Sequence, residues 1–187
     1  MTLQQLLESE HAPEALTSAL KLEAPLNLRN AATVAGTLVS FDGRSTFASV
    51  LLALEAKLEQ TGLDHSKIET RTSSIGEFLP LRNLQGSLIT SISLPLNVKL
   101  AFDYVSRTPA DKPIVCAALA QWNSGRTRLV VGGYGKSPLL AMDGTEAEGL
   151  EAAARNAFHE ATDEWASAEY RMDVAATLAK RCLGSLS

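Results

Sequence analysis

The chain has 187 residues, of which 45% are hydrophobic and 20% charged, and its formal net charge at pH 7 is -4. That length is enough to bury the core of one domain or of two small lobes. A negative net charge without a run of Lys or Arg excludes the electrostatic footprint of a protein that binds nucleic acid or an anionic membrane surface. The sequence has neither an apolar stretch of membrane-spanning length nor a signal-peptide pattern, so we expect a cytoplasmic protein.

Two prolines divide the first forty residues. Pro13 stands where a first helical turn would begin, and Pro25 ends the partly apolar face that follows it, so a helix is predicted between them. Residues 26–39 begin with small and polar side chains and end in a short apolar run, and Asp42 and Gly43 form a turn signal. This pattern predicts a loop, a tight turn and a short strand.

A second helix and two strands are predicted before Pro95. Ser45 can cap a helix whose apolar residues recur at spacings of three and four as far as Leu58. Alternating side chains predict strands over residues 67–71 and 88–94. Because Pro95 closes the second of these strands, we expect a boundary between two lobes near this residue.

Strands followed by helices are predicted for the second half. The three predicted strands span residues 98–104, 114–122 and 127–131. The turn between the last two is short enough for a hairpin, which favours an antiparallel sheet. A capping-box spacing that starts at Thr145 predicts a helix, and a last helix carries Tyr170 and is expected to stop at Gly184. The predicted fold class is therefore α+β, with one lobe over residues 1–95 and a second lobe, residues 96–187, in which helices pack on an antiparallel sheet.

Two segments resemble a phosphate loop and a metal site, but their residues do not support either kind of site. The glycine-rich residues 132–137 have the wrong spacing for a phosphate loop, and Pro138 prevents the helix that such a loop needs, so a strand end and a turn with positive φ are predicted. His159 and Asp163 are spaced like two metal ligands on a helix, but no third ligand is evident, and no metal site is expected. No Ser-His or Cys-His arrangement is evident either, so we expect no catalytic residue in this chain.

Residues 29–37 are unusually rich in small side chains. Such a run lets backbone amides approach a phosphate, and the hydroxyls of Thr33 and Thr37 could add hydrogen-bond donors. A small-residue turn that packs against a helix explains the same composition. The residues alone favour this second interpretation and leave the first one open.

Within that segment, Arg29 and Asn30 followed by residues 32–37 resemble the second FAD motif of the flavin subunits of molybdenum hydroxylases, the family of xanthine dehydrogenase and carbon monoxide dehydrogenase. The family motif reads Arg-Asn and then Ala-Thr-Ile-Gly-Gly-Asn. Further segments resemble, in the same order, the loop and helix that follow this motif and the opening strand and closing helix of the family's carboxyl-terminal domain. They are residues 42–45, 51–56, 102–111, 168–171 and 178–181.

The resemblance implies a partial FAD site in the first lobe, which corresponds to the family's second FAD-binding subdomain. The residues that match or adjoin the motif would face the FAD phosphates or the ribityl chain, and these are Asn30, Thr33, Val34, Ala35, Gly36 and Thr37. Thr46 stands at the start of the next helix, where the family often has Asp, and Phe102 would lie near the flavin ring. The site is partial because the family's amino-terminal FAD lobe would precede residue 1. The second lobe would be the carboxyl-terminal domain of the carbon monoxide dehydrogenase flavoprotein type.

By the same resemblance, the chain is expected to be an FAD-binding, electron-transferring subunit or fragment of a molybdenum-hydroxylase-type oxidoreductase. Its partners would be a molybdopterin-binding large subunit, an iron–sulfur small subunit and a separate amino-terminal FAD lobe, and self-association is left open. The alternative interpretation is a degenerate interaction or assembly module without bound flavin. In either case the substrate would be set by another subunit.

Overall fold

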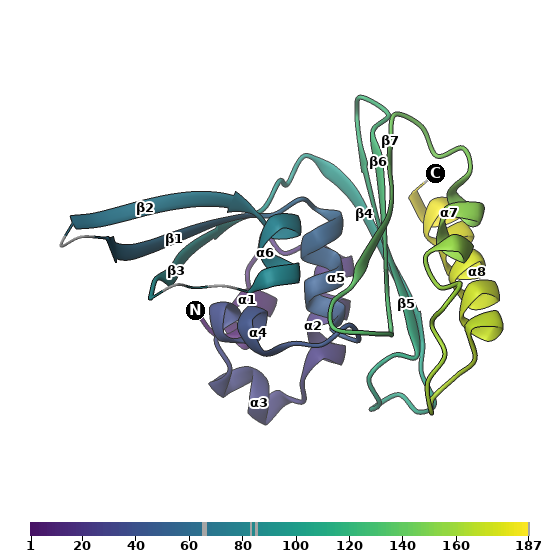
Figure 1. Cartoon of the computed structure of the whole chain (residues 1–187), viewed down its shortest axis with the longest axis horizontal. Helices are drawn as coiled ribbons and strands as arrows, with labels where there is room; N and C mark the ends of the chain where they lie inside the picture. Colours follow the sequence, from purple (N-terminus) through teal and green to yellow (C-terminus); the bar gives the residue numbers. More distant parts are fainter. Residues whose placement is uncertain (65–66, 83, 85, 187) are drawn as a thin grey trace.

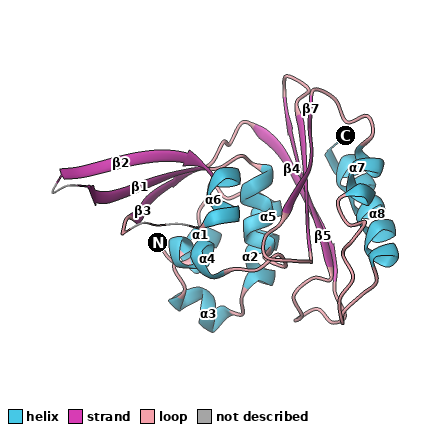
Figure 2. Ribbon diagram, viewed as in Figure 1, coloured by secondary structure: helices cyan, strands magenta, loops and turns pink. Residues whose placement is uncertain are grey.

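The computed structural model describes residues 1–64, 67–82, 84 and 86–186. In the described part, short helices and a three-stranded sheet make up the amino-terminal half, and a four-stranded sheet with two helices makes up the other half (Figure 1, Figure 2). Both sheets are antiparallel. The α+β fold class predicted from the sequence is therefore confirmed.

The helices of the amino-terminal half include one that is buried along its whole length. They are α1 (Leu3–Leu7), α2 (Glu14–Glu23), α3 (Leu26–Ala31), α4 (Val34–Ser40), α5 (Thr46–Ala53) and α6 (Ile75–Leu81). Every residue of α5 is buried, and the buried residues of α2 belong to the same core. Because α2 lies between Pro13 and Pro25, the helix predicted there is confirmed.

The strand predicted within residues 26–39 is wrong, because this segment forms α3 and α4. Pro25 occupies the position before α3, and the hydroxyl of Thr33 caps α4 by accepting a hydrogen bond from the amide of Gly36. Leu38, at the apolar end of the predicted strand, is buried from α4 instead. The start signals of two short helices therefore outweigh the strand pattern.

The second predicted helix is correct at its start and wrong at its end. Ser45 caps α5 as expected, but the helix ends at Ala53 and the chain turns at Glu55, whose φ is 54°. A left-handed backbone conformation stops a helix, and it is uncommon at a residue other than glycine. Leu58 is buried, as its helical spacing suggested, but it reaches the core from a strand.

A three-stranded sheet projects from the amino-terminal half (Figure 1). Its strands are β1 (Lys57–Asp64), β2 (Lys67–Ser74) and β3 (Leu88–Ser93), in the order β2-β1-β3. The two strands predicted in this region are confirmed as β2 and β3. Strand β1 was not predicted, because its first residues continue the helical spacing of the preceding segment.

The second sheet is a meander in which neighbouring strands follow one another along the chain. It consists of β4 (Val98–Val105), β5 (Val115–Trp122), β6 (Thr127–Gly132) and β7 (Leu139–Gly144), in the order β4-β5-β6-β7. The three predicted strands and the hairpin between β5 and β6 are confirmed, whereas β7 was missed. Gly133 and Gly135, in the turn after β6, have φ values of 128° and 75°. The structural interpretation of this glycine-rich segment is thus confirmed.

Two helices cover the outer face of the second sheet (Figure 2). The predicted helices are present as α7 (Leu150–Asn156) and α8 (Ala168–Leu186). The predicted cap at Thr145 is wrong, because α7 begins after Gly149 without a side-chain cap, and α8 continues through Gly184. No helix in the described residues is long and apolar enough to cross a lipid bilayer.

The central strands β5 and β6 of the four-stranded sheet are buried on both faces, which joins the two halves of the chain. Ala118, Ala120 and Val130 pack into the core built around α5. Residues next to them along the same strands, such as Leu119 and Leu129, pack into a second core with α7 and α8. The boundary predicted near Pro95 falls in the connection between β3 and β4, and it stays a prediction.

Candidate functional site

A cavity of about 460 Å³ lies where the start of α4 meets β3. Its wall is mainly apolar, and it is lined by Met1, Leu6, Thr33, Val34, Ala35, Phe47, Leu51, Ile89, Thr90, Ser91, Ile92 and Leu94. Ligand cavities are commonly apolar and carry a few polar groups that orient the ligand. Half of the sequence-predicted motif, Thr33 to Ala35, therefore lines the cavity.

The first turn of α4 satisfies most of its own hydrogen-bonding groups. The amide of Gly36 donates to Thr33 Oγ1 at 3.0 Å, and the amide of Val34 donates to the carbonyl of Met1 at 3.1 Å. The hydroxyl of Thr37 donates to the carbonyl of Thr33 at 2.9 Å. Several donors that the sequence offered to a phosphate are thus already paired within the protein.

Two donors remain for a ligand at this helix start. Among the hydrogen bonds of the described residues, none involves the amide of Ala35. The hydroxyl of Thr33 accepts a bond from Gly36 and keeps its own proton. A Cβ at position 36 would lie 2.8 Å from Thr33 Oγ1, so a larger residue there would require a small shift of this hydroxyl. This donor set fits one phosphate or ribityl oxygen of a flavin nucleotide, and the apolar wall fits an uncharged part of it.

The other predicted site residues do not line this cavity. Asn30 is exposed at the end of α3. Phe102 lies half-buried on β4, where it packs against the first core and stacks on Tyr104 with 6.0 Å between ring centroids. The structure thus does not bring Phe102 and the start of α4 together in one cavity, and a contact between Phe102 and a flavin stays a prediction.

Thr46 is 1% exposed and serves the interior of the protein. Its hydroxyl donates to the carbonyl of Ala19 at 2.7 Å and lies 3.2 Å from a carboxylate oxygen of Glu23. The same carboxylate oxygen accepts hydrogen bonds from the Ser45 hydroxyl at 2.8 Å and from the Phe47 amide at 2.9 Å. Glu23 therefore caps α5 from a neighbouring helix, and this arrangement leaves Thr46 no room for a cofactor.

Cavity walls from distant segments could not be identified from the sequence. Phe47 and Leu51 carry the helical spacing of core residues, and residues 89–92 carry strand alternation. Neither pattern distinguishes a side chain that fills a core from one that lines a cavity. The motif identified one wall, and tertiary packing determined the other.

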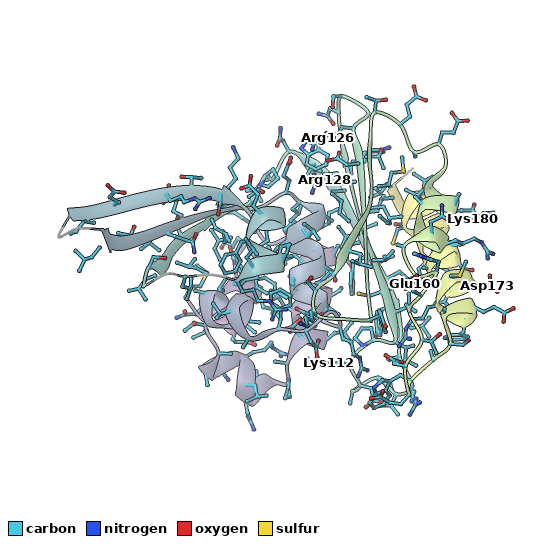
Figure 3. The ribbon with its side chains drawn as sticks, viewed as in Figure 1. Lys112, Arg126, Arg128, Glu160, Asp173 and Lys180 are labelled. Atoms are coloured by element: carbon cyan, nitrogen blue, oxygen red, sulfur yellow. The ribbon has the colours of Figure 1, made fainter. Side chains whose placement is uncertain are left out.

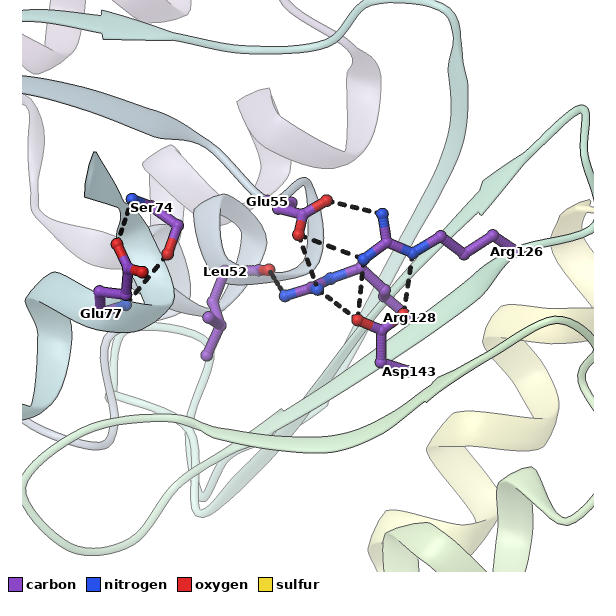
Figure 4. A network of polar contacts seen from close by, with 7 residues as sticks. All are labelled: Leu52, Glu55, Ser74, Glu77, Arg126, Arg128 and Asp143. Carbon is purple, nitrogen blue, oxygen red and sulfur yellow. Dashed lines mark hydrogen bonds and ion pairs between the residues drawn. The ribbon is translucent and has the colours of Figure 1, made fainter. Parts of the chain in front are cut away.

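A network of charged side chains joins the turn after α5 to the four-stranded sheet (Figure 4). Arg126 contacts Glu55 at 2.7 Å and Asp143 at 2.8 Å. Arg128 contacts the same two carboxylates at 3.3 Å and 2.6 Å and donates to the carbonyl of Leu52 at 3.1 Å. The hydrogen bond from Arg126 and the positive charges of both arginines hold the pKa of Asp143 below its usual value. Figure 3 shows both arginines where the sheet meets the amino-terminal half, away from Lys180 on α8.

A second charge pair, in which the arginine is fully buried, holds the loop before α8. Arg171 is 0% exposed and donates to both carboxylate oxygens of Asp163, at 2.8 and 2.9 Å. It also donates to the carbonyls of Ala161 and Ala166 and lies over the ring of Tyr134. Asp163, considered above as a metal ligand, thus has a structural partner. Within the described residues no group of three or more His, Cys, Asp or Glu side chains could hold a metal ion.

Solved oxidoreductase structures share this fold over the whole chain. A chain of carbon monoxide dehydrogenase from Hydrogenophaga pseudoflava is 20% identical with a TM-score of 0.80. Reconstituted CO dehydrogenase from Oligotropha carboxidovorans is 21% identical with a TM-score of 0.79. Quinoline 2-oxidoreductase from Pseudomonas putida 86 is 17% identical with a TM-score of 0.77. Each comparison covers 100% of this chain and 72% of the other. A comparison with curated protein sequences gives no match.

This chain therefore has the same fold as these oxidoreductase chains. Residues 1–97 match the family described as the FAD binding domain in molybdopterin dehydrogenase. The chain belongs to this family, and FAD is the cofactor of the family. The resemblance inferred from the sequence motifs is therefore confirmed.

Proposed function

We propose that this chain forms part of an FAD site and serves as the flavin-holding, electron-transferring part of a molybdopterin-dependent oxidoreductase. The observation that carries the proposal is the position of the motif: Thr33, Val34 and Ala35 line a cavity in a chain of the FAD-binding family. Bound FAD would supply the redox chemistry, and the protein would supply binding, orientation and a suitable electrostatic environment.

The two free donors at the start of α4 define the polar end of the proposed contact. The amide of Ala35 and the hydroxyl proton of Thr33 would donate to a phosphate or ribityl oxygen. The side chains of Phe47 and Leu51, which line the cavity from α5, would contact an uncharged part of the nucleotide. Two donors leave most of a pyrophosphate charge uncompensated, so weak binding by this chain alone is expected.

The proposed partners follow from the family. A molybdopterin-binding large subunit and an iron–sulfur small subunit would supply electrons to the flavin, and an amino-terminal FAD lobe would complete the nucleotide site. Such a lobe would add donors that the start of α4 lacks. The proposal therefore predicts that FAD affinity rises when these partners are present.

A second candidate function is an assembly module that holds no flavin. It is favoured by the internal hydrogen bonds of the motif, because the amides of Val34 and Gly36 and the hydroxyl of Thr37 are already paired. Ala35 also stands where the family has glycine, so a side chain narrows the approach to the backbone.

Calorimetric titration with FAD, alone and with the partner subunits, separates the two candidates. The variant Ala35→Glu places a carboxylate in the cavity wall and should weaken FAD binding about tenfold or more by repelling the phosphates. The control Ala152→Glu adds the same charge at an exposed position of α7 and should bind FAD like the wild type. Absence of saturable binding even with partners present would refute the flavin proposal, as would equal affinities of the two variants.

A further inference from the structure

Strand β2 is an open edge of the projecting sheet (Figure 1). It is eight residues long, contains no proline, and pairs with β1 in a continuous register from Lys57↔Ser74 to Asp64↔Lys67. Proteins commonly protect sheet edges with short strands, bulges or prolines. The other edge of this sheet follows that rule, because the pairing of β1 with β3 shifts between Glu59 and Gln60. The edge at β2 has none of these three protections, although the exposed Glu69 and Arg71 place charges along it, which can also protect an edge.

The middle of β2 is accessible on both faces of the sheet. Residues 68–72 are all exposed, and Ile68 is 76% exposed. Ile68 lies directly opposite Leu63 of β1, which is 75% exposed, so the two form an uncovered aliphatic pair. A strand added beside β2 would cover part of Ile68 and satisfy the outward-facing backbone groups of the edge.

The charges on β2 indicate which strand fits there. Glu69 and Arg71 flank Thr70 and point to the same face of the sheet, because side chains alternate along a strand. When two copies of β2 pair antiparallel about a two-fold axis through Thr70, Glu69 of each copy lies opposite Arg71 of the other. An axis through Glu69 or through Arg71 would instead place two identical charges opposite each other.

We propose that two copies of this chain associate through β2, with Thr70 on the two-fold axis, to form one continuous six-stranded sheet. The interface is isologous, so each Glu69–Arg71 pair occurs twice. The opposite charges select the register of the two strands. Backbone hydrogen bonds between the two copies of β2 and the partial burial of Ile68 stabilise the dimer. This inference is independent of FAD binding.

Sedimentation of the full chain over micromolar to millimolar concentrations tests the interface. The wild type should show a monomer–dimer equilibrium. Glu69→Arg and Arg71→Glu should each weaken dimerisation about tenfold or more, because each places two like-charged pairs across the axis. Glu10→Arg, an equal charge change at an exposed site outside the sheet, should leave dimerisation unchanged.

Rescue experiments make the test specific for the register. A mixture of the Glu69→Arg and Arg71→Glu variants should form a heterodimer, and the double variant carrying both substitutions should dimerise like the wild type. Circular dichroism checks that each variant is folded, which is expected for exposed positions. A wild type that stays monomeric overturns the proposal. Single variants that dimerise normally, or a double variant and mixture that both stay monomeric, overturn it equally.

Discussion

The guanidinium group of Arg128 lies 3.3 Å from the carboxylate of Glu55 and joins the four-stranded sheet to the turn after α5. Glu55 is brought there by its left-handed backbone conformation, and Arg128 reaches it from β6 with 5% of its surface exposed. The turn that ends α5 and the strand that carries Arg128 are therefore held together by a nearly buried charge.

Replacing Arg128 should weaken the fold more than replacing its neighbour Arg126. Arg128→Ala removes a buried charge that pairs with two carboxylates and a carbonyl, and we expect a loss of about 2–4 kcal/mol in the free energy of unfolding. The side chain of Arg126 is 39% exposed, so Arg126→Ala should cost about 1 kcal/mol or less. Urea unfolding of both variants gives the two values, and equal losses would contradict the structural role assigned to Arg128.

Acid should destabilise the protein through Asp143 and Asp163. The hydrogen bond from Arg126 lowers the pKa of Asp143 from 3.8. Burial by itself would raise the pKa of Asp163, but the hydrogen bonds from Arg171 and two backbone amides lower it from 3.8. A carboxyl with a lowered folded-state pKa contributes stability above its unfolded pKa and loses it as pH falls through the folded pKa.

The contribution of these two carboxylates to the unfolding free energy should therefore be constant above about pH 5 and fall below about pH 4. Asp163→Asn should lower stability at neutral pH and make the remaining stability less sensitive to acid. Urea unfolding at a series of pH values measures both effects. A variant that loses stability with acid as steeply as the wild type would rule out Asp163 as a source of the pH dependence.

The second half of the chain should not fold alone, although a lobe boundary is predicted near Pro95. A fragment of residues 96–187 would expose the face of the sheet that carries Ala118, Ala120 and Val130, which are now 0% exposed. We expect the fragment to lack cooperative unfolding and dispersed amide signals. A fragment with a sharp thermal transition would instead show that the second core suffices.

The sequence predicted the second half of the fold better than the first, for physical reasons. The hairpin of β5 and β6 combines strand alternation with a short turn, and both signals are local. Strand β1 could not be recognised from the sequence, because Leu58 continues the helical spacing of α5. Only the turn at Glu55 separates the helix from the strand. No glycine marks that turn, so its left-handed conformation could not be foreseen.

The candidate site was predicted in part. Residues 33–35 line the cavity as their small side chains and motif suggested. Thr46 was placed at the site by position in the motif, but its bonds to Ala19 and Glu23 depend on how α2 packs against α5. Such contacts between helices cannot be derived from residue spacing within one of them.

Two glycines, one in the turn after β6 and one within α8, should respond in opposite ways to replacement by alanine. A Cβ at Gly133 would lie 2.0 Å from the carbonyl oxygen of Ile114, and φ there is 128°, so Gly133→Ala should destabilise the protein by about 3 kcal/mol or more. Gly184 lies within α8 with nothing within 4 Å of such a Cβ, so Gly184→Ala should stabilise the protein by about 0.5–1 kcal/mol. Thermal unfolding distinguishes the two signs, and a neutral Gly133→Ala would contradict the turn geometry.

The most direct test of the FAD site is an NMR titration of the isotope-labelled chain with FAD, which detects binding even at millimolar affinity. We expect the amide signals of Ala35 and Gly36 and of residues 89–92 to move in a saturable way, whereas those of α8 stay in place. Unchanged signals at α4 and β3 at the highest FAD concentration, or changes confined to other parts of the chain, would contradict the proposed flavin site.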